Sequence, residues 1–507
     1  MATIQDLPVE LLLTIFQHVY PFLSSMDPTP KTKAHQSSAY RLSKDRACRY
    51  RRSVKHGPSD GEIMALKYPV TSLSVCRLWR NILQANLIQF YVDEYSPAYI
   101  EQFESQIRQA NVEFALDIRV INRRADDTDK HEEKQIAQDV MKIISPILYR
   151  CRTLVFKLLY GSSLPVISQD FSGNAPDLLL LKLQCRIRED EITTPVKGPI
   201  IGPDLFARSQ DRFTTPNLTI LALDGLTFAD AFLIPSWVAQ MANLSLDKLS
   251  ISHCGPSHTL YNAFDVYFLL DSLSSIAHIR HLILDDIGIE TTHEILFAGH
   301  PHPRYHLKVD HLTITRPQKA SVVRQFLLRS VWPVLDYFHL SQAPIDHRSI
   351  PAVHHLRLEE AHISGYFWHG FMTTLNRFYG HRLDLIKCEA LCDQHLLQIG
   401  THCERMFRLY IKDCPNITVG GLKAMIIARN DNIQDEHQEE ADTDNDEYLM
   451  PVDESSVIER AFGRYFSGAR DIPFVPIHRL HISGHPCVLS QADKRWFRKH
   501  VREFCWV

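Results

Sequence analysis

The stretch that decides the fold is RLDLIKCEALCDQHLLQIGTHCERMFRLYIKDCPNITVGGL, residues 382–422, because it contains one pattern twice. A shift of 26 residues superimposes the two copies at five positions. The earlier copy has Leu383, Leu385, Cys388, Leu391 and Leu396, and the later copy has Leu409, Ile411, Cys414, Ile417 and Leu422. Five coincidences at one offset are hard to obtain by chance and indicate an internal repeat.

The Leu-x-Leu core of this pattern recurs along most of the chain. Weaker copies lie at Leu181/Leu183, Leu221/Leu223, Leu249/Ile251, Leu282/Leu284, Leu312/Ile314, Phe338/Leu340, Leu356/Leu358 and Leu480/Ile482, with Leu154/Phe156 as a candidate first copy. From residue 221 onward, the successive intervals are 28, 33, 30, 26, 18, 27, 26 and 71 residues. The middle values bracket the period of about 20–29 residues that is typical of leucine-rich repeats. The interval of 18 casts doubt on one of the two copies it separates, and the interval of 71 spans an insertion.

Each copy predicts one strand and one returning helix. The two apolar residues of the core lie on the same side of an extended strand, because side chains alternate along it. A helix such as residues 422–426 would then bring the chain back. One repeat cannot bury its apolar side alone, so neighbouring repeats are expected to stack. Each buried side chain is worth about 1.5–3 kcal/mol.

Composition and charge narrow the class of protein. The chain has 507 residues, of which 45% are hydrophobic and 22% charged, as in ordinary globular proteins. Lysine and arginine (55) nearly balance aspartate and glutamate (59), which argues against a whole-chain nucleic-acid or membrane-surface binder. We expect no secretory signal, since residues 1–10 carry two acidic and no basic residues, and no membrane helix, since no apolar run reaches about 18 residues. The eleven scattered cysteines predict reduced thiols in the cytoplasm or nucleus.

Two apolar helices are expected at the start of the chain. In residues 4–23 apolar side chains recur at helical spacing around Pro8, a residue that suits a first helical turn. In residues 71–92 a second apolar stripe surrounds Trp79. Helices this short need each other or another surface to be stable. An ordinary N-terminal helical cap would explain the periodicity equally well.

The residues themselves resemble the F-box motif over residues 4–23 and 69–92. The matching residues are Leu7, Pro8, Glu10, Leu11, Leu12, Ile15 and Phe16 in the first half, and Leu73, Ser74, Cys76, Arg77, Trp79, Arg80 and Ile82 in the second. In that family a small helical bundle docks on a Skp-type adaptor, which ties it to a cullin ubiquitin ligase. The resemblance implies adaptor binding by Leu7, Pro8, Leu11, Leu12, Ile15, Phe16, Leu73, Val75, Cys76, Trp79 and Ile82.

A long polar insert separates the two halves, where the family has a short link. Residues 24–68 are rich in lysine and arginine. Loop closure becomes costlier only with the logarithm of loop length, so the module is still expected to assemble. The insert predicts a solvated loop, and nucleic-acid binding or nuclear targeting is the alternative.

The resemblances together imply an α/β chain in which a short all-α F-box module precedes an irregular leucine-rich-repeat solenoid, a right-handed β-α superhelix. We expect the F-box-like module at 1–92, a linker and helical entry segment at 93–150, the solenoid at 151–490 and a capping helix at 491–507. A surface loop at 123–134 should precede a helix near 136–148. Helical spacing predicts the cap from Trp496, Phe497, Val501, Phe504 and Trp506.

One acidic segment interrupts the expected solenoid. Residues 431–447, DNIQDEHQEEADTDNDE, hold nine acidic and no basic residues other than one histidine. Such a block predicts a solvated, disordered loop over about 431–450. A specific binding tail is the alternative.

Local motifs of several enzyme classes are absent from the sequence. It has no phosphate-binding loop, dinucleotide fingerprint, His-Glu-x-x-His or nucleophile elbow. Two groups of conceivable metal ligands are Cys388, Cys392, His395, His402, Cys403 and Cys414, and the loop residues His293, His300, His302 and His306. We interpret these cysteines as core residues of the repeat and these histidines as solvated, and expect no catalytic residue, metal or cofactor.

Strand residues that flank the core leucines face the opposite side of the sheet. Near the C-terminal end they include Arg357, Arg382, Arg408, Tyr410, Lys412, Arg479 and His481, interrupted by Glu359 and Asp384. Arginine binds carboxylate or phosphate in a forked geometry, and tyrosine adds contact area at low entropic cost. These seven residues are therefore a hypothetical site for an acidic or phosphorylated target protein, and unrelated surface charges are the alternative.

The implied function is that of a non-enzymatic substrate receptor. The adaptor and cullin would supply the ubiquitin-transfer machinery, and the repeats would hold an unidentified target, so that transfer becomes a proximity effect. Two other hypotheses stay open. One is a leucine-rich-repeat interaction scaffold without a ligase role, and the other is a nucleic-acid-associated protein that acts through residues 31–55.

Overall fold

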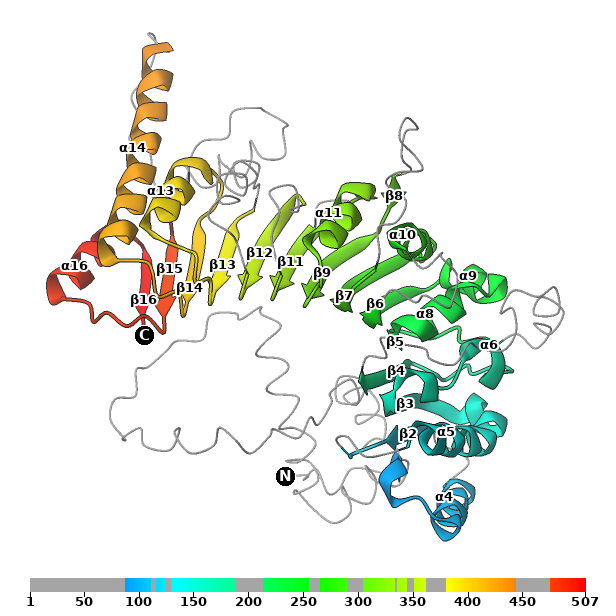
Figure 1. Cartoon of the computed structure of the whole chain (residues 1–507). Helices are drawn as coiled ribbons and strands as arrows, with labels where there is room; N and C mark the ends of the chain where they lie inside the picture. The colour runs from blue at the N-terminus through cyan, green and yellow to red at the C-terminus, as the bar shows by residue number, and fades with distance from the viewer. Residues whose placement is uncertain are drawn as a thin grey trace, which may run out of the picture.

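One long, curved sheet organises the chain in the computed structural model (Figure 1). The structure describes residues 87–110, 115–124, 129–187, 213–254, 265–289, 304–332, 335–343, 351–361, 380–443 and 475–507. In these residues fourteen parallel strands follow one another in chain order. They are β1 (Leu87–Tyr91), β2 (Leu116–Ile121), β3 (Cys151–Tyr160), β4 (Leu180–Ile187), β5 (Ile220–Asp224), β6 (Ser245–Cys254), β7 (His278–Ile287), β9 (Val309–Thr315), β11 (Leu335–Ser341), β12 (Val353–Glu359), β13 (Arg382–Ile386), β14 (Arg408–Lys412), β15 (Arg479–Ser483) and β16 (Glu503–Trp506).

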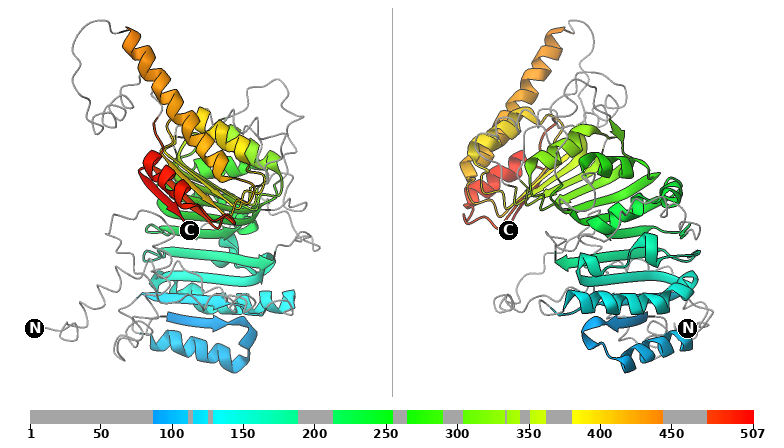
Figure 2. Two further views of the ribbon diagram at one scale, coloured as in Figure 1. Left: turned by 90° about the vertical axis from the view of Figure 1, so that its left-hand side faces the viewer. Right: turned by 45° about the vertical axis from the view of Figure 1, so that its right-hand side comes forward.

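Helices lie mainly on the outer side of the curve, and the strands line its inner side (Figures 1 and 2). The α-helices are α4 (Pro97–Gln109), α5 (Lys130–Ile144), α6 (Ile167–Asp170), α8 (Gly225–Phe232), α9 (Pro235–Met241), α10 (Val266–Ser274), α11 (Ala320–Arg329), α13 (Asp393–His402), α14 (Val419–Thr443) and α16 (Gln491–His500). The short 3-10 helices are η3 (Val92–Glu94), η4 (Ser145–Arg150) and η5 (Gly161–Ser163). A separate pair of strands consists of β8 (Tyr305–His306) and β10 (Ser330–Val331).

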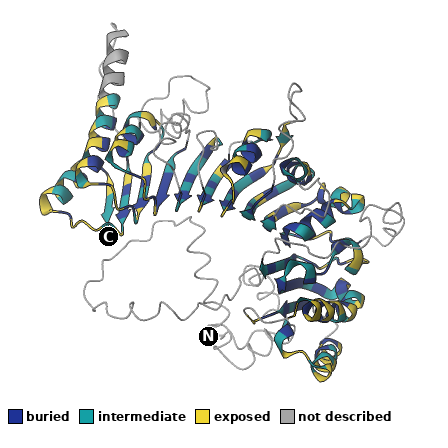
Figure 3. Ribbon diagram, in the orientation of Figure 1, coloured by how far each residue is buried: buried dark blue, intermediate teal, exposed yellow. Residues whose placement is uncertain are grey.

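Each of the fourteen strands contributes two apolar side chains to a continuous ladder. Leu383 lies opposite Leu356 and Leu409 on the neighbouring strands. Leu385 lies opposite Leu358 and Ile411 in the same way. Every Leu-x-Leu copy predicted from the sequence lies in this register, the candidate first copy at residues 154 and 156 included. Buried residues occur along the strands from β1 to β15, whereas the residues of the last strand, β16, are intermediate or exposed (Figure 3).

The two copies that are only 18 residues apart are both strands. Phe338 lies opposite Leu356, and Leu340 lies opposite Leu358. The doubt about one of them was therefore wrong. In the residues that the structure describes, no helix lies between β11 and β12.

The outer helices close the core against the ladder. The buried apolar residues form one cluster that extends from Ile88 to Val501. Close packing of α13 on α14 depends on Gly400, because a Cβ there would lie 2.4 Å from the carbonyl oxygen of Met425. The sheet and its helices are thus one folded unit.

Eight strands end in the same turn. The residue two positions after the second core residue has a positive φ on β6, β7, β9 and β11–β15, at His253, Asp286, Arg316, Gln342, Glu360, Lys387, Asp413 and Gly484. The next position is buried on seven of these strands and is the half-buried His485 on β15; on β13 and β14 it holds Cys388 and Cys414. Their thiols lie 3.8 and 3.7 Å from the carbonyl oxygens of Leu358 and Leu385, respectively. The interpretation of these two cysteines as core residues of the repeat is confirmed.

The expected fold class, a short all-α module followed by an irregular leucine-rich-repeat solenoid, is wrong. The described residues hold no separate all-α module, and one α/β sheet begins at Leu87, inside the segment predicted to be helical over 71–92. Alternation explains the strand, because Ile88 and Phe90 are buried in the ladder while Gln89 between them is not. Residues 1–86, which carry the rest of the expected module, lie outside the described residues.

Two further boundaries differ from the prediction. The segment 93–150 is not a linker, because β2 is the second strand of the sheet. The helix expected near 136–148 is present as α5, but it starts at Lys130, where the Asp129 carboxylate accepts a hydrogen bond from the backbone N–H of His131 at 2.9 Å. This helix cap replaces the second half of the expected loop.

The acidic segment and the C-terminus also differ from expectation. Residues 431–443 continue α14 instead of starting a loop, in keeping with the high helix propensity of their glutamate, glutamine and alanine residues. The predicted cap is a helix only to His500, after which the chain adds β16. Phe504 and Trp506 therefore extend the ladder, opposite Leu480 and Ile482.

Truncation of the ladder should destabilise the fold. Leu385 is fully buried in the middle of the C-terminal half, so Leu385→Ala removes apolar burial and leaves a cavity. We expect a loss of about 2–5 kcal/mol in the free energy of unfolding, measured by urea denaturation. Leu397→Ala, at an exposed site on α13, should change it by less than about 0.5 kcal/mol. Hydrogen exchange should place the loss of protection mainly on β12–β14, and equal effects of the two variants would contradict the ladder.

Candidate protein-binding surface

The strand residues that flank the ladder form the inner face of the sheet. On β7 and the strands that follow, this face has two rows of side chains in register. The first row is His281, His311, Tyr337, His355, Arg382, Arg408, Arg479 and Glu503, and the second row is Ile283, Thr313, His339, Arg357, Asp384, Tyr410, His481 and Cys505.

All seven residues predicted to bind a target lie together on this inner face. The first row contains Arg382, Arg408 and Arg479, the second row contains Arg357, Tyr410 and His481, and Lys412 lies further along β14. Their common placement follows directly from the strand register. The prediction that the structure brings them together is confirmed, whereas their role in binding stays a prediction.

Three arginines stand side by side in the first row. Arg408 lies opposite Arg382 on one neighbouring strand and opposite Arg479 on the other. The outer two are paired within the chain: Arg382 Nε donates to Asp384 at 2.8 Å, and Arg479 Nη2 donates to Glu503 at 3.1 Å. For Arg408, the described residues offer no carboxylate within ion-pair distance. Burial, and then the charges of Arg479 and Arg382, lower the pKa of Arg408, and the charge of Glu503 opposes this shift.

A buried carboxylate and two rings lie beside these arginines. Burial opposes ionisation of Asp384, but hydrogen bonds from His355 at 2.9 Å and from Arg382 outweigh it and lower the pKa of the carboxyl group. The rings of Tyr410 and His481 pack in a tilted arrangement, with 4.8 Å between their centroids. The arginine row therefore adjoins an aromatic contact area.

Sequence reasoning missed an aromatic stretch of the first row. Successive rings of His281, His311, Tyr337 and His355 lie 4.3, 5.8 and 4.8 Å apart between centroids. Each of these four residues directly precedes the first core residue of its own strand. The same flanking rule that located the arginines would have located these rings on the preceding copies.

Burial favours the uncharged form of several side chains on this part of the face. Burial and then His311 lower the pKa of His281 to about 4, and burial raises the pKa of Tyr337 to about 12. In the second row, burial and then Arg357 lower the pKa of His339 to about 4. The inner face thus has an aromatic part on β7–β12, which also contains Arg357, and a part on β13–β15 that contains the row of three arginines.

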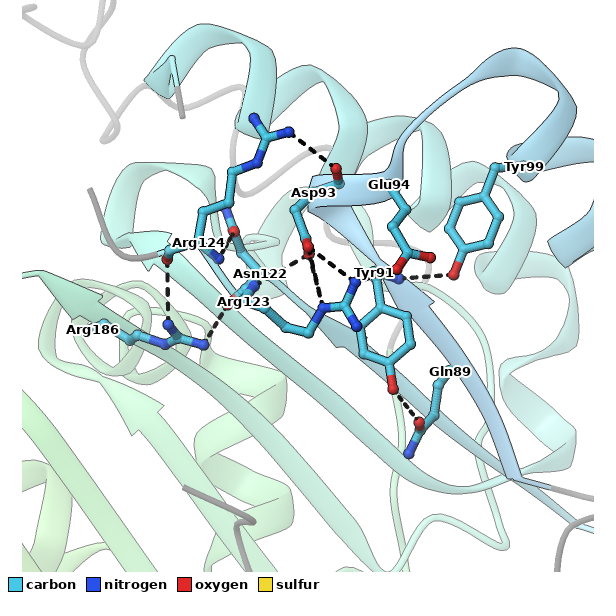
Figure 4. Close-up of polar contacts among 9 residues, drawn as sticks. All are labelled: Gln89, Tyr91, Asp93, Glu94, Tyr99, Asn122, Arg123, Arg124 and Arg186. Carbon is cyan, nitrogen blue, oxygen red and sulfur yellow. Dashed lines mark hydrogen bonds and ion pairs between the residues drawn. The ribbon is translucent and has the colours of Figure 1, made fainter. Parts of the chain in front are cut away.

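A second polar cluster lies at the N-terminal end of the sheet (Figure 4). The Arg123 guanidinium carbon lies 3.9 Å from the centroid of the Tyr91 ring, and its Nη2 lies 3.0 Å from the Asp93 carboxylate. Arg186 donates to the backbone carbonyl of Asn122. These cations are engaged by groups of the same chain and join β1, β2 and β4, so we assign this cluster to the fold.

The cysteines and histidines between residues 388 and 414 do not converge on a metal site. Cys392 and His395 cap α13, with 3.2 Å between Sγ and Nδ1, and Cys403 is buried in the core. Of the loop histidines, His306 is exposed on β8, and those at 293, 300 and 302 lie outside the described residues. In the part of the chain that the structure describes, a compact group of three metal-ligand side chains occurs elsewhere, on β4–β6.

The expected adaptor site cannot be placed on this sheet. Its eleven residues, from Leu7 to Ile82, and the basic insert at 24–68 all lie outside the described residues. Among the helices that are described, none is long and apolar enough to cross a membrane.

Comparison with known proteins adds no assignment. The sequence matches no protein-family model, and the search of curated proteins gives no significant match. The resemblance to F-box and leucine-rich-repeat proteins therefore depends on the residues quoted above.

Acidification should destabilise the inner face. A histidine whose pKa is near 6.5 in the unfolded chain and about 4 when folded contributes stability that is complete above pH 6.5 and is lost as the pH falls towards 4. Urea denaturation of the full chain should therefore show a free energy of unfolding that falls between about pH 7.5 and about pH 4.5. These values lie about one unit above and about two units below the pKa of a free histidine. His281→Gln should flatten this dependence, and His306→Gln, at an exposed site, should leave it unchanged. An unaltered slope in His281→Gln would contradict the assignment.

Proposed function

We propose that this chain is a substrate-recognition subunit of a Skp-cullin-F-box type ubiquitin ligase, and that its inner face binds the target protein. The observation that supports target binding is Arg408, a cation flanked by two others and lacking a described carboxylate partner. Burial is the main cause of the lowered pKa of Arg408, and an anionic group beside it would offset the second cause, the charges of Arg479 and Arg382. Carboxylate and phosphate are the anions whose geometry matches the guanidinium fork.

The surroundings of Arg408 suit a protein partner. Tyr410 and His481 offer two half-buried, tilted rings beside it, and Lys412 adds a second exposed cation on the same strand. Arginine and tyrosine are enriched among residues that dominate binding energy at protein interfaces. We infer that an acidic or phosphorylated segment of the target lies across β13–β15.

The N-terminal segment carries the second half of the proposal. Its F-box-like residues, Leu11 and Trp79 among them, would bind a Skp-type adaptor and through it a cullin. Ubiquitin transfer would then follow from proximity, with the catalytic groups on partner proteins and none on this chain. Such a ligase acts in the cytoplasm or nucleus.

Adaptor binding separates this proposal from a scaffold without a ligase role. The full chain should co-purify with the adaptor and the cullin, and Leu11→Ala with Trp79→Ala should abolish this, since truncation of an apolar interface anchor costs about 2 kcal/mol or more. Circular dichroism should show unchanged folding of the variant. Deletion of residues 31–55 serves as a control and should keep the adaptor bound. If the folded wild-type chain binds no adaptor, the ligase role is wrong; salt-dependent nucleic-acid binding that needs residues 31–55 would favour the nucleic-acid hypothesis instead.

Charge reversal on the inner face should abolish anion recognition without affecting the adaptor. In Arg408→Glu with Lys412→Glu, two cations become anions, and affinity for acidic and phosphorylated peptides from a synthetic library should fall about tenfold, because two exposed charge pairs worth about 0.2–1 kcal/mol each are lost and replaced by repulsion. Fluorescence anisotropy at two salt concentrations measures this affinity.

A matched control carries the same charge change on another surface. Arg495 and Lys499 are exposed on α16, so their replacement by glutamate should leave peptide affinity unchanged. Equal binding by all three proteins would contradict the proposed site, as would a preference for uncharged peptides.

A further inference from the structure

Three side chains of different chemistry meet at the carboxyl ends of β4, β5 and β6. The Cys185 Sγ atom lies 3.1 Å from Asp224 Oδ2 and 3.5 Å from His253 Nδ1. His253 Nδ1 lies 3.5 Å from the same carboxylate oxygen. A thiol, a carboxylate and an imidazole thus present one atom each to a common point.

Asp224 and His253 follow Cys185 in the sequence by 39 and 68 residues, and the strand register brings the three together. Each follows the second core residue of its strand by one or two positions, and the three strands are neighbours in the sheet. Gly225 allows the end of β6 to approach, because a Cβ there would lie 2.9 Å from the carbonyl oxygen of His253. The cluster is therefore built by the fold and is independent of the inner face described above.

The protein holds the three side chains in place. Asp224 accepts a hydrogen bond from the backbone N–H of Leu226 through Oδ1 at 3.1 Å, which leaves Oδ2 directed at the other two residues. The Asp224 and His253 side chains are only 3% and 12% exposed. Such outer contacts are typical of carboxylate ligands whose orientation is fixed before the metal binds.

The distances match those of a tetrahedral zinc site. With bonds of about 2.3 Å to sulfur and 2.0–2.2 Å to nitrogen and oxygen, tetrahedral geometry places pairs of ligand atoms about 3.3–3.6 Å apart. Two of the three measured distances, both 3.5 Å, lie in this range, and the third, 3.1 Å, is a few tenths shorter. A small rotation of the Cys185 side chain removes that difference.

Gly161 lies directly beside the cluster. A Cβ at this glycine would lie 3.3 Å from Asp224 Oδ1 and 3.6 Å from Cys185 Sγ, so a larger residue would crowd the three side chains. Three protein ligands with one water are a common arrangement for zinc.

A nucleophilic cysteine fits the geometry less well than a metal ligand. An ionised thiol at Cys185 would lie 3.1 Å from the Asp224 carboxylate, and two negative charges at that distance repel unless a cation lies between them. The imidazole also directs the same nitrogen at both partners, whereas a catalytic triad places the histidine between nucleophile and carboxylate through its two nitrogens.

We propose that Cys185, Asp224 and His253 bind one zinc(II) ion, with a water molecule as the fourth ligand. The thiol loses its proton to solvent on binding, and the thiolate and imidazole select zinc over magnesium or calcium. The ion joins the ends of β4, β5 and β6.

Metal titration of the purified, chelator-treated full chain tests this assignment. The wild-type protein should bind one equivalent of zinc in competition with a chromophoric chelator, and cobalt(II) should give a thiolate-to-cobalt charge-transfer band. Cys185→Ser should lose the band and weaken zinc binding at least tenfold, a typical effect of the loss of a metal-site residue. Cys151→Ser is the matched control: this cysteine is also buried in the sheet, its thiol lies 3.6 Å from the Ile147 carbonyl oxygen, and its replacement should change neither result.

A second variant guards against misfolding of Cys185→Ser. His253 has φ 54, a conformation that asparagine tolerates, so His253→Asn removes the imidazole with little strain. It should keep the circular dichroism spectrum and weaken zinc binding at least tenfold. Failure of the wild-type chain to bind zinc, or zinc binding that persists unchanged in the folded His253→Asn and Cys185→Ser variants, would overturn the proposal.

Discussion

The fold depends on one constraint: two apolar side chains per strand must stay in register with two on each neighbour. Each strand is too short to bury these side chains alone, so the stack is stable only as a whole. Different residues can meet this constraint: Leu383 and Leu385 do so in β13, and Phe504 and Trp506 do so in β16. Because side chains alternate along a strand, the same register determines what faces inward on the other side.

This register also determines which side chains are neighbours on the inner face. Arg382, Arg408 and Arg479 are far apart in the sequence, yet the sheet places them on three consecutive strands. Two carboxylates pair with the outer arginines, and the middle one, which is exposed, has no described carboxylate within ion-pair distance. This arrangement is what supports our proposal of an anionic partner.

The sequence predicted those strands of the sheet that carry the Leu-x-Leu repeat. The Leu-x-Leu pattern located eleven of the fourteen strands, two of them from pairs that include a phenylalanine, and the flanking positions located the arginine row. It missed β1, β2 and β16, whose ladder residues include Ile88, Val120 and Trp506, because few of their residues are leucine. Charge composition predicted the acidic segment but concealed the helix propensity of its first part. The cluster of Cys185, Asp224 and His253 could not be found from spacing, since only the register of three strands brings it together.

The central claim is that a target protein lies across the cationic part of the inner face. Site-specific photocrosslinking tests it most directly, with a photoreactive amino acid in place of Tyr410 and, as control, in place of Tyr149, which is 55% exposed on η4 and lies outside the two rows. Our account predicts that position 410 of the full chain crosslinks to segments of one target rich in acidic or phosphorylated residues, and that position 149 does not. Crosslinks to that target from position 149 and none from position 410 would contradict it.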